Sequence, residues 1–301
     1  MTAEKPAALL GTIGDLVEDI VVRLAGPINA ASDTEARIVR RRGGSAANMA
    51  VSVVRAGGRA RFIGQVGDDA VGEQLVRGLA DEGVDVVARR AGRTGAIVVL
   101  LDADGERTFL TDRAVCALLD DPDATWLDGL SVLHVPVYSL VGEPLATTAA
   151  TLIGWAHDRG VIVSVDASSS AVLDGYGAER MRALLSGLRP DVLLCNELEA
   201  ATLGGVDAVA TIGAGITVVK HGGGDALLLA TPAETWASIP AEHVDAVLDT
   251  TGAGDAFAAG FLVALAGGAT AVDAVCAGHA IAAELIRSLA LSAGGAERRP
   301  L

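Results

Sequence analysis

The chain has 301 residues, a formal net charge of −15, 51% hydrophobic residues and only 3% aromatic residues. This length suits one large α/β domain, and the apolar fraction is ample for a buried core of aliphatic residues and alanine. The strong negative charge disfavours nucleic acid as a partner, because nucleic-acid backbones are bound through lysine and arginine.

Three features of the sequence indicate the cellular compartment of the protein. The cysteines are odd in number and far apart, which argues for a reducing compartment and against disulfides or a zinc site. The N-terminus has no apolar core typical of a signal peptide. The run 256–272 is apolar, but Asp255 and Asp273 flank it and Gly267-Gly268 interrupt it, so it predicts a buried helix and no membrane partner. We expect a cytoplasmic protein.

Short β-branched runs alternate with helical patterns along the whole chain. The expected strands are 7–13, 60–66, 95–101, 131–135, 161–165, 190–194 and 216–220. The expected helices are 45–56, 69–82, 144–159, 178–188, 196–203, 253–266 and 270–288. The alternation predicts a three-layer α/β sandwich in which helices cover both faces of a mostly parallel central sheet.

Two stretches depart from this alternation. Residues 18–42 have the pattern of a strand, a turn and a second strand, and residues 95–111 have that of a hairpin. Both could leave the main sheet and form a small β lid. No linker or internal repeat divides the chain, so we expect a single domain over 1–301.

Two glycine-containing segments come first among the candidate sites. Asp15 and Asp19 follow the first strand, where the carboxyl edge of a parallel sheet suits ligand binding. Gly43-Gly44 lead into a helix that carries Asn48, whose amide can donate and accept hydrogen bonds as a polyol requires. Solvated loop acids and an ordinary helix start remain alternatives for these segments.

Two further segments follow later strands. Asn196 and Glu199 open a helix, either as a simple capping box or as groups that hold Mg²⁺ through water. Lys220 and Gly222 lie where a strand ends in a glycine-rich segment, either a loop that admits a nucleotide or a plain hairpin turn.

The most informative segment is 249–257, Asp-Thr-Thr-Gly-Ala-Gly-Asp-Ala-Phe. A helix N-terminus attracts a phosphoryl group, because its N–H groups are unpaired and carry partial positive charge. Gly252 and Gly254 let the backbone come close to the phosphate. Asp255 lies in the first turn, where it could take a proton from an attacking hydroxyl. The segment predicts a kinase.

Other interpretations of this segment are weaker. It could be a plain helix cap formed by Thr250 or Thr251. A dinucleotide-binding G-x-G-x-x-G would need glycine at Phe257, and a Walker loop would need a Gly-Lys pair, which the chain lacks.

In their order, these motifs resemble the ribokinase-like (phosphofructokinase-B type) carbohydrate kinase family over nearly the whole chain. The blocks that carry the resemblance are Gly14-Asp15 to Asp19, Gly43-Gly44 to Asn48, 62–72, Asn196 to Glu199, Lys220 to Gly222, and 249–255. The resemblance implies a ribokinase-like α/β layer with a β lid.

The resemblance also implies roles. Asp255 would be the catalytic base, and the backbone of Gly252, Ala253 and Gly254 would be the anion hole for the transferred phosphate. Asp15, Asp19, Gly43, Gly44 and Asn48 would bind the substrate, and Lys220, Gly222 and Thr250 would bind the nucleotide. ATP is the implied co-substrate, with Mg²⁺ ordered by Asn196 and Glu199. Some relatives also use a monovalent cation such as K⁺, for which Asp249 and Thr251 are the candidate ligands.

The chain departs from the family in two places. Members with an Asp-x-Asn-x-Arg motif have Asn and Arg where this chain has Ser168 and Ser170, which puts phosphate contacts there in doubt. The usual glycine after Arg113 is Ala114.

The substrate is expected to be a sugar or sugar-like molecule. A nucleoside would need an aromatic face, which Phe62, Phe109, Tyr138 or Tyr176 would have to supply. A phosphorylated sugar would need arginines such as Arg107 or Arg113 in the pocket. A non-catalytic sugar sensor and a homodimer formed through exposed lid edges are the remaining alternatives.

Overall fold

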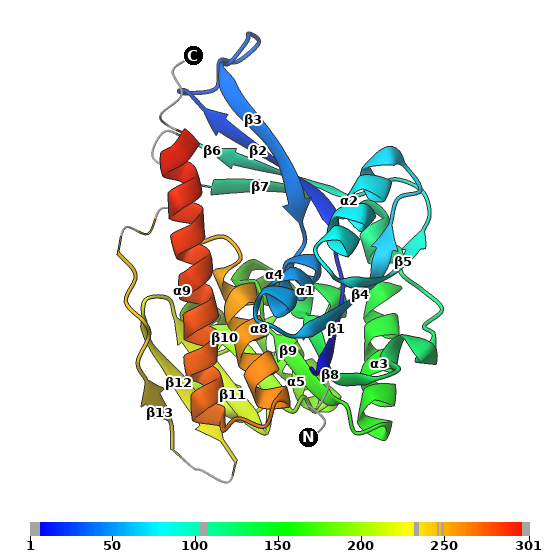
Figure 1. The fold of residues 1–301 in the computed structure, drawn as a ribbon, viewed down its shortest axis with the longest axis vertical. Coiled ribbons are helices and arrows are strands. Elements are labelled where there is room, and N and C mark those ends of the chain that lie inside the picture. Colours follow the sequence, from blue (N-terminus) through cyan, green and yellow to red (C-terminus); the bar gives the residue numbers. More distant parts are fainter. Residues whose placement is uncertain (1–6, 103–106, 232–234, 246, 248–249, 297–301) are drawn as a thin grey trace, which may run out of the picture.

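A large sheet with helices on both faces and a separate small sheet above it make up the fold (Figure 1). The computed structural model describes residues 7–102, 107–231, 235–245, 247 and 250–296, and from 291 onward only the backbone. The arrangement confirms the expected ribokinase-like α/β class.

The large sheet has the strand order β13-β12-β11-β10-β9-β8-β1-β4-β5. Its strands are β1 (Leu9–Ile13), β4 (Arg59–Val66), β5 (Asp85–Arg90), β8 (Leu130–Pro136), β9 (Ile162–Asp166), β10 (Val192–Asn196), β11 (Ile216–His221), β12 (Gly224–Ala230) and β13 (Ala237–Ile239). All neighbours from β5 to β11 pair in parallel, whereas β12 and β13 add on antiparallel. The expected mostly parallel sheet is therefore confirmed.

Two hydrophobic clusters pack on the two faces of this sheet. Successive residues of one strand point to opposite faces, so Leu193 joins one cluster and Leu194 the other. One face is covered by α1 (Ser45–Arg55), α2 (Ala70–Asp81), α8 (Ala253–Ala266) and α9 (Ala271–Ala296). The other is covered by α3 (Leu145–Asp158), α4 (Ser170–Tyr176), α5 (Ala178–Leu188), α6 (Glu197–Thr202) and α7 (Val206–Ala210). Short 3₁₀ turns are η1 (Ala114–Leu118), η2 (Ala124–Leu127) and η3 (Val137–Leu140).

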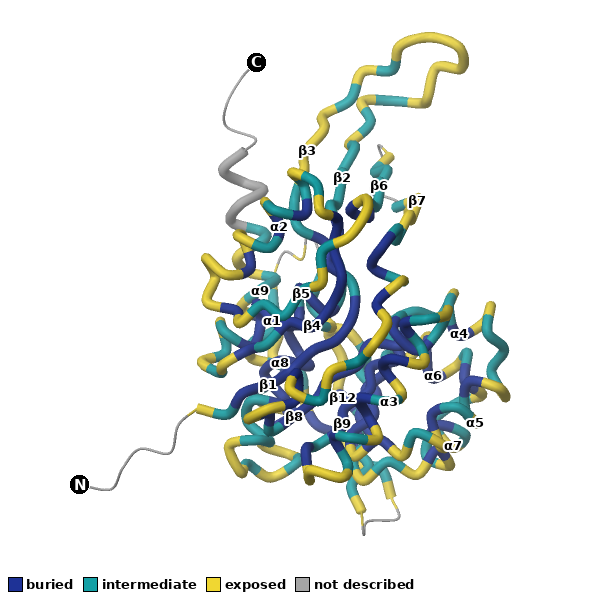
Figure 2. The backbone as a smooth tube through the Cα atoms, turned by 90° about the vertical axis from the view of Figure 1, so that its right-hand side faces the viewer, coloured by how far each residue is buried: buried dark blue, intermediate teal, exposed yellow. Residues whose placement is uncertain are grey.

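The small sheet has the order β3-β2-β6-β7, formed by β2 (Val17–Leu24), β3 (Ala36–Gly43), β6 (Ala96–Leu101) and β7 (Arg107–Asp112). These strands come from the two stretches that break the strand–helix alternation. The turn expected at 103–106 lies outside the described residues. Figure 2 shows that the far end of the β2–β3 hairpin is exposed while the large sheet is buried.

Several elements were not expected from the sequence: β5, β12, β13, α4 and α7. The segment after Lys220 is a tight hairpin, in which His221 pairs with Gly224 and Gly222 has φ +58°. The backbone here therefore has the conformation of a hairpin turn, one of the two expected alternatives. β12 and β13 are held by antiparallel pairing to their neighbours, which local sequence patterns do not encode.

Within the described ranges, no helix is both long and apolar enough to cross a membrane. The apolar run 256–272 is divided between α8 and α9, and Gly268 between them has φ +95°. This confirms the expected break at the glycine pair.

The two helices on either side of this break are in close contact through glycines. A Cβ on Gly260 of α8 would lie 2.6 Å from the Ala277 carbonyl oxygen of α9. A Cβ on Gly278 would lie 2.9 Å from the Phe257 carbonyl oxygen. Since both clashes are with backbone, the helices would have to separate to admit a side chain.

We therefore expect Gly260→Ala to lower the free energy of unfolding by roughly 1–3 kcal/mol, the usual cost of overpacking. The matched control is Gly154→Ala in α3, because that glycine is exposed and has no heavy atom within 4 Å of a built Cβ. There the loss of chain entropy in the unfolded state should stabilise the protein by about 0.4–1 kcal/mol. Urea unfolding of both variants measures the difference, and equal effects would contradict the close α8–α9 packing.

Candidate active site

The candidate residues gather at the carboxyl edge of the large sheet. β1 pairs with β4 on one side and β8 on the other, so the strand order reverses between β1 and β8. Such a switch point opens a crevice in which α/β proteins bind ligands. Asp15 follows β1, Tyr138 follows β8, and Asp166 ends β9.

Asp255 lies where the N-termini of α1 and α8 meet. The Ser45 hydroxyl at the start of α1 donates to Asp255 Oδ1 at 2.7 Å, and the Asn48 side chain also hydrogen-bonds this carboxyl. Desolvation, together with the negative charge of Asp166, raises the pKa of Asp255 to about 7, although the bonds from Ser45 and Asn48 oppose the rise. The group is a carboxyl that can change protonation state near neutral pH.

The turn before Asp255 contains the glycines of the predicted anion hole. Gly252 is the N-cap of α8 in the left-handed region, with φ +79°, which only glycine adopts without strain. Gly254 is exposed at this turn. The N–H of Ala253 donates to the Thr250 carbonyl at 3.0 Å, so this donor is engaged within the turn.

The glycine pair before α1 makes two close contacts, one with the neighbouring strand β2 of the small sheet and one with the segment that follows β1. A Cβ on Gly43 would lie 1.9 Å from Asp19 Oδ1, and one on Gly44, which has φ +98°, would lie 2.2 Å from the Asp15 carbonyl oxygen. Glycine is required at Gly44, where the clash is with backbone and φ is positive, whereas a side chain at Gly43 would displace the Asp19 carboxylate.

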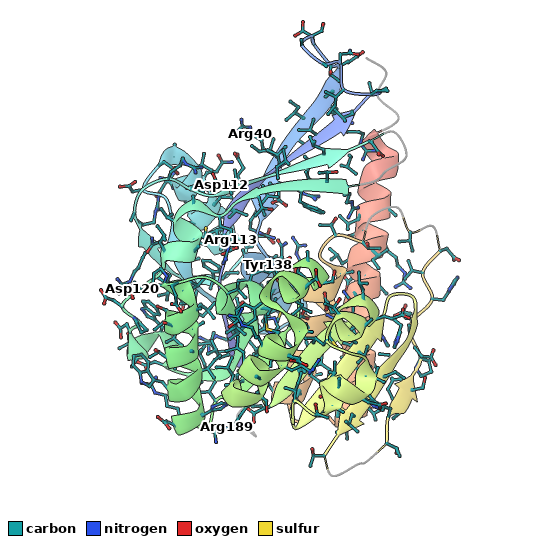
Figure 3. The ribbon with its side chains drawn as sticks, turned by 180° about the vertical axis from the view of Figure 1, so that it is seen from behind. Arg40, Asp112, Arg113, Asp120, Tyr138 and Arg189 are labelled. Carbon is teal, nitrogen blue, oxygen red and sulfur yellow. The ribbon has the colours of Figure 1, made fainter. Side chains whose placement is uncertain are left out.

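Both of these acids face arginines. Arg113 donates two hydrogen bonds to Asp15, from Nε to Oδ2 at 2.7 Å and from Nη2 to Oδ1 at 2.9 Å. Figure 3 shows Arg113 and Tyr138 between the small sheet and the body. Asp19 Oδ2 lies 3.9 Å from Arg41 Nε, and burial raises the pKa of Asp19. Neither acid is the solvated loop residue of the alternative interpretation.

Asn196 and Glu199 form a complete capping box at α6. Glu199 Oε2 accepts from the Asn196 backbone N–H at 2.8 Å, and Glu199 Oε1 accepts from Asn196 Nδ2 at 2.7 Å. Glu199 is only 4% exposed, and burial with the nearby charge of Asp166 raises its pKa to about 7. The capping interpretation is confirmed, and it leaves both carboxylate oxygens hydrogen-bonded.

The Lys220 side chain folds back into the site. Its Nζ donates to Asp166 Oδ2 at 2.8 Å, and both side chains are almost buried, with 13% and 10% exposure. Asp166 Oδ1 accepts from the Ser168 N–H at 2.7 Å. The pair spans the end of β10, which separates β9 from β11.

The remaining predicted site residues have fewer contacts with the rest of the candidate site, or lie outside the described residues. Thr250 is exposed, and Thr251 Oγ1 accepts from Arg107 Nη1 at 2.8 Å. Gly222 is in the β11–β12 turn. Asp249, the other candidate ligand of a monovalent cation, lies outside the described residues.

Sequence reasoning did not select Ser45 or Asp166 as site residues, and it considered Tyr138 only as an aromatic face for a nucleoside. Ser45 directly follows Gly43-Gly44 and Asp166 ends a strand at the carboxyl edge, so both had a positional signal. Tyr138 hydrogen-bonds Ser169, and burial raises its pKa. A cavity of about 10 Å³ lies between Asp15, Ser45 and Tyr138, whereas the larger hollow of about 670 Å³ lies along α2.

The residues present fit a hydrated Mg²⁺. Asp166, Glu199 and Asp255 place carboxyl oxygens around the Lys220 ammonium, and oxygen atoms are the ligands that Mg²⁺ prefers. In the described part of the chain, no group of three or more His, Cys, Asp or Glu residues is arranged to hold a metal directly. The donor set therefore suits Mg²⁺ bound through its water shell and through phosphate oxygens.

Known proteins with similar sequences are kinases. A fructokinase from Klebsiella pneumoniae is 34% identical over 269 residues, which are 84% of this chain and 83% of the relative. An ATP-dependent ribose-1-phosphate kinase from Halopiger xanaduensis is 35% identical over 241 residues, 77% of this chain and 76% of the relative.

Solved structures agree. A fructokinase from Vibrio cholerae O395 with bound fructose, ADP and calcium ion has a TM-score of 0.75 and 26% identity, with 93% of both chains covered. The adenosine kinase of Sinorhizobium meliloti has a TM-score of 0.82 over 97% of this chain and 100% of the other, but at 24% identity it shows the fold alone.

The resemblance drawn from the motifs is confirmed over almost the full length. Residues 9–296 match the family described as pfkB family carbohydrate kinase. The chain belongs to the pfkB family of carbohydrate kinases.

Proposed function

We propose that this enzyme transfers the γ-phosphate of ATP to a hydroxyl of a sugar or sugar-like molecule. The observation that carries the proposal is the carboxyl of Asp255 at the N-terminus of α8, held by Ser45 2.7 Å away and kept at a pKa of about 7. A base with this pKa can accept a hydroxyl proton at neutral pH.

Each step uses residues of this chain. Asp15, Asp19, Gly43, Gly44 and Asn48 would bind the substrate and orient its hydroxyl. Asp255 would accept the proton of that hydroxyl as its oxygen attacks the γ-phosphorus in line. The backbone of Gly252, Ala253 and Gly254 would stabilise the charge that develops on the transferred group.

The nucleotide and ion contacts complete the proposal. Lys220, Gly222 and Thr250 would lie on the nucleotide side. Asn196 and Glu199 would orient Mg²⁺ through water, and Mg²⁺ when bound neutralises charge on the phosphates. A K⁺ ion behind the anion hole would be held by Asp249 and Thr251.

The small sheet would act as a lid that excludes water, since water would otherwise compete for the phosphoryl group. We treat 1–301 as one kinase domain that includes this lid. Arg107, which comes from β7, reaches Thr251 beside the cradle and so already links the two parts.

A nucleoside substrate is less well supported than a sugar. Phe62 is fully buried, so it cannot stack on a base, and Tyr176 lies against Arg180. Tyr138 is the aromatic residue close to Asp15 and Ser45. A phosphorylated sugar is the stronger second candidate, because Arg113 and Arg107 both lie at the site and a relative is a ribose-1-phosphate kinase.

The function can be tested by measuring ADP release from Mg·ATP with a panel of pentoses, hexoses, sugar phosphates and nucleosides. We expect one strong responder, and we expect Asp255→Asn to lower kcat by at least about 10²-fold, since general-base catalysis contributes that much or more. Nucleotide binding should persist in the variant. If ATP and sugar bind but no ADP forms with any compound, the sensor alternative would replace the kinase.

The raised pKa of Asp255 predicts the pH dependence. The carboxylate form is the active one, so kcat/KM should rise with pH through about 7 and then level off. Asp166, Glu199 and Lys220 also face the site, and Glu199 has a pKa of about 7 as well. A second variant is therefore needed to identify the titrating group.

Ser45→Ala makes that distinction. Loss of its hydrogen bond removes a stabiliser of the Asp255 carboxylate, so the rising limb should move up by about one pH unit. The control is Ser186→Ala, an exposed position in α5. An unmoved limb in Ser45→Ala would mean that Asp255 is not the group whose titration is seen.

We further propose that two copies associate through the small sheet. Its edge strands β3 and β7 carry exposed apolar side chains, with Ile38 61% and Phe109 58% exposed. Light scattering should give about twice 30.3 kDa, and Ile38→Glu with Phe109→Glu should give the monomer mass. Val272→Glu, at another exposed apolar position, should leave the mass unchanged. A wild-type monomer would contradict the proposal.

A further inference from the structure

The chain contains two lysines, Lys5 and Lys220, whereas its other 21 cationic side chains are arginines. Lys220 is nearly buried at the carboxyl edge of the sheet. A lysine ammonium is a compact, strongly hydrated charge, and its burial is costly unless something at the site compensates for it.

The position of this ammonium is the first step. Its Nζ lies 3.6 Å from the point where a Cβ on Gly254 would stand, and 6.0 Å from the centre of the Phe257 ring. It is therefore packed against the first turn of α8, whose N–H groups form the proposed anion hole. A phosphoryl group bound at that turn would be close to the Lys220 charge.

Hydrogen bonding is the second step. The ammonium has three donors, and one of them goes to Asp166 Oδ2 at 2.8 Å. Asp166 is itself fixed by the Ser168 N–H, so its carboxylate has a defined orientation. The pair joins β9 to β11 across the end of β10 and holds the ammonium in place.

We infer that Lys220 stabilises the phosphoryl group during its transfer, and that Asp166 is the positioning residue that aims Lys220 at the anion hole. This inference rests on the proposed function. It assigns Lys220 to the transferred phosphate instead of to the nucleoside part of ATP.

The step balances as follows. The substrate oxygen forms a bond to the γ-phosphorus while its proton passes to Asp255. The bond between the γ-phosphorus and the bridging oxygen breaks, and its electron pair leaves with ADP. Lys220 keeps all its protons and acts through charge and hydrogen bonding.

If the Lys220–Asp166 pair only stabilised the fold, its removal would change stability but not kcat. Lys220→Met alone leaves Asp166 buried without its partner, and this destabilises the fold. The double variant Asp166→Asn/Lys220→Met removes both charges, so it should recover stability. If Lys220 acts on the phosphoryl group, kcat of the double variant should still fall by about 10²-fold, with KM for ATP within about threefold.

Asp166→Asn alone is the matched control, because it keeps the ammonium. An asparagine at 166 still offers Lys220 an oxygen acceptor but holds it less firmly, so kcat should fall, and by less than in the double variant. The inference is overturned if the double variant has nearly wild-type kcat, or if Asp166→Asn loses as much as the double variant. Absence of wild-type turnover on every compound would instead overturn the proposed function.

A direct observation is feasible because there are only two lysines. Protein labelled with ¹⁵N at lysine Nζ should give two signals, and Lys220→Met identifies the buried one. Mg²⁺ with β,γ-methylene-ATP should shift this signal, whereas Mg·ADP should leave it nearly unchanged. Equal responses to both nucleotides would overturn the inference. If calorimetry shows that neither nucleotide binds, the proposed function falls with it.

Discussion

The site depends on one carboxyl group, Asp255, enclosed between the starts of two helices. Desolvation favours its neutral form, whereas the Ser45 hydroxyl, Asn48 and the positive ends of α1 and α8 favour the carboxylate. Desolvation outweighs the groups that favour the carboxylate, so the pKa is raised to about 7. A more polar setting would give a weaker base, and a drier one would keep it protonated.

This balance requires two distant segments to meet closely. The chain enters α1 beside Asp255 through Gly44, which has positive φ and lies against the Asp15 backbone with no room for a side chain. The same segment connects β3 of the small sheet to α1, which packs on the large sheet. The proposed substrate contacts, the proposed lid and the surroundings of Asp255 thus share one stretch of backbone.

Local patterns were enough to predict the α/β class, the start of α8 and the cap at Asn196, because each is encoded within a few residues. They could not predict the pairs that define the site. Ser45 and Asp255 are 210 residues apart, Asp15 and Arg113 are 98 apart, and Asp166 and Lys220 are 54 apart. Those contacts depend on how distant segments are arranged around the sheet. The same holds for the antiparallel strands β12 and β13, which the local patterns also did not predict.

The charges around Asp255 bear on how the proposed site would accept a triphosphate in an acidic protein. Asp166 neutralises Lys220 in the structure, and burial with the charge of Asp166 holds the pKa of Glu199 at about 7. The resting site therefore carries little uncompensated charge despite its three acids. A phosphate and a divalent cation that enter together add opposite charges, so they disturb this balance less than either alone. If the site binds ATP as proposed, this arrangement would favour the metal–nucleotide complex over the free nucleotide.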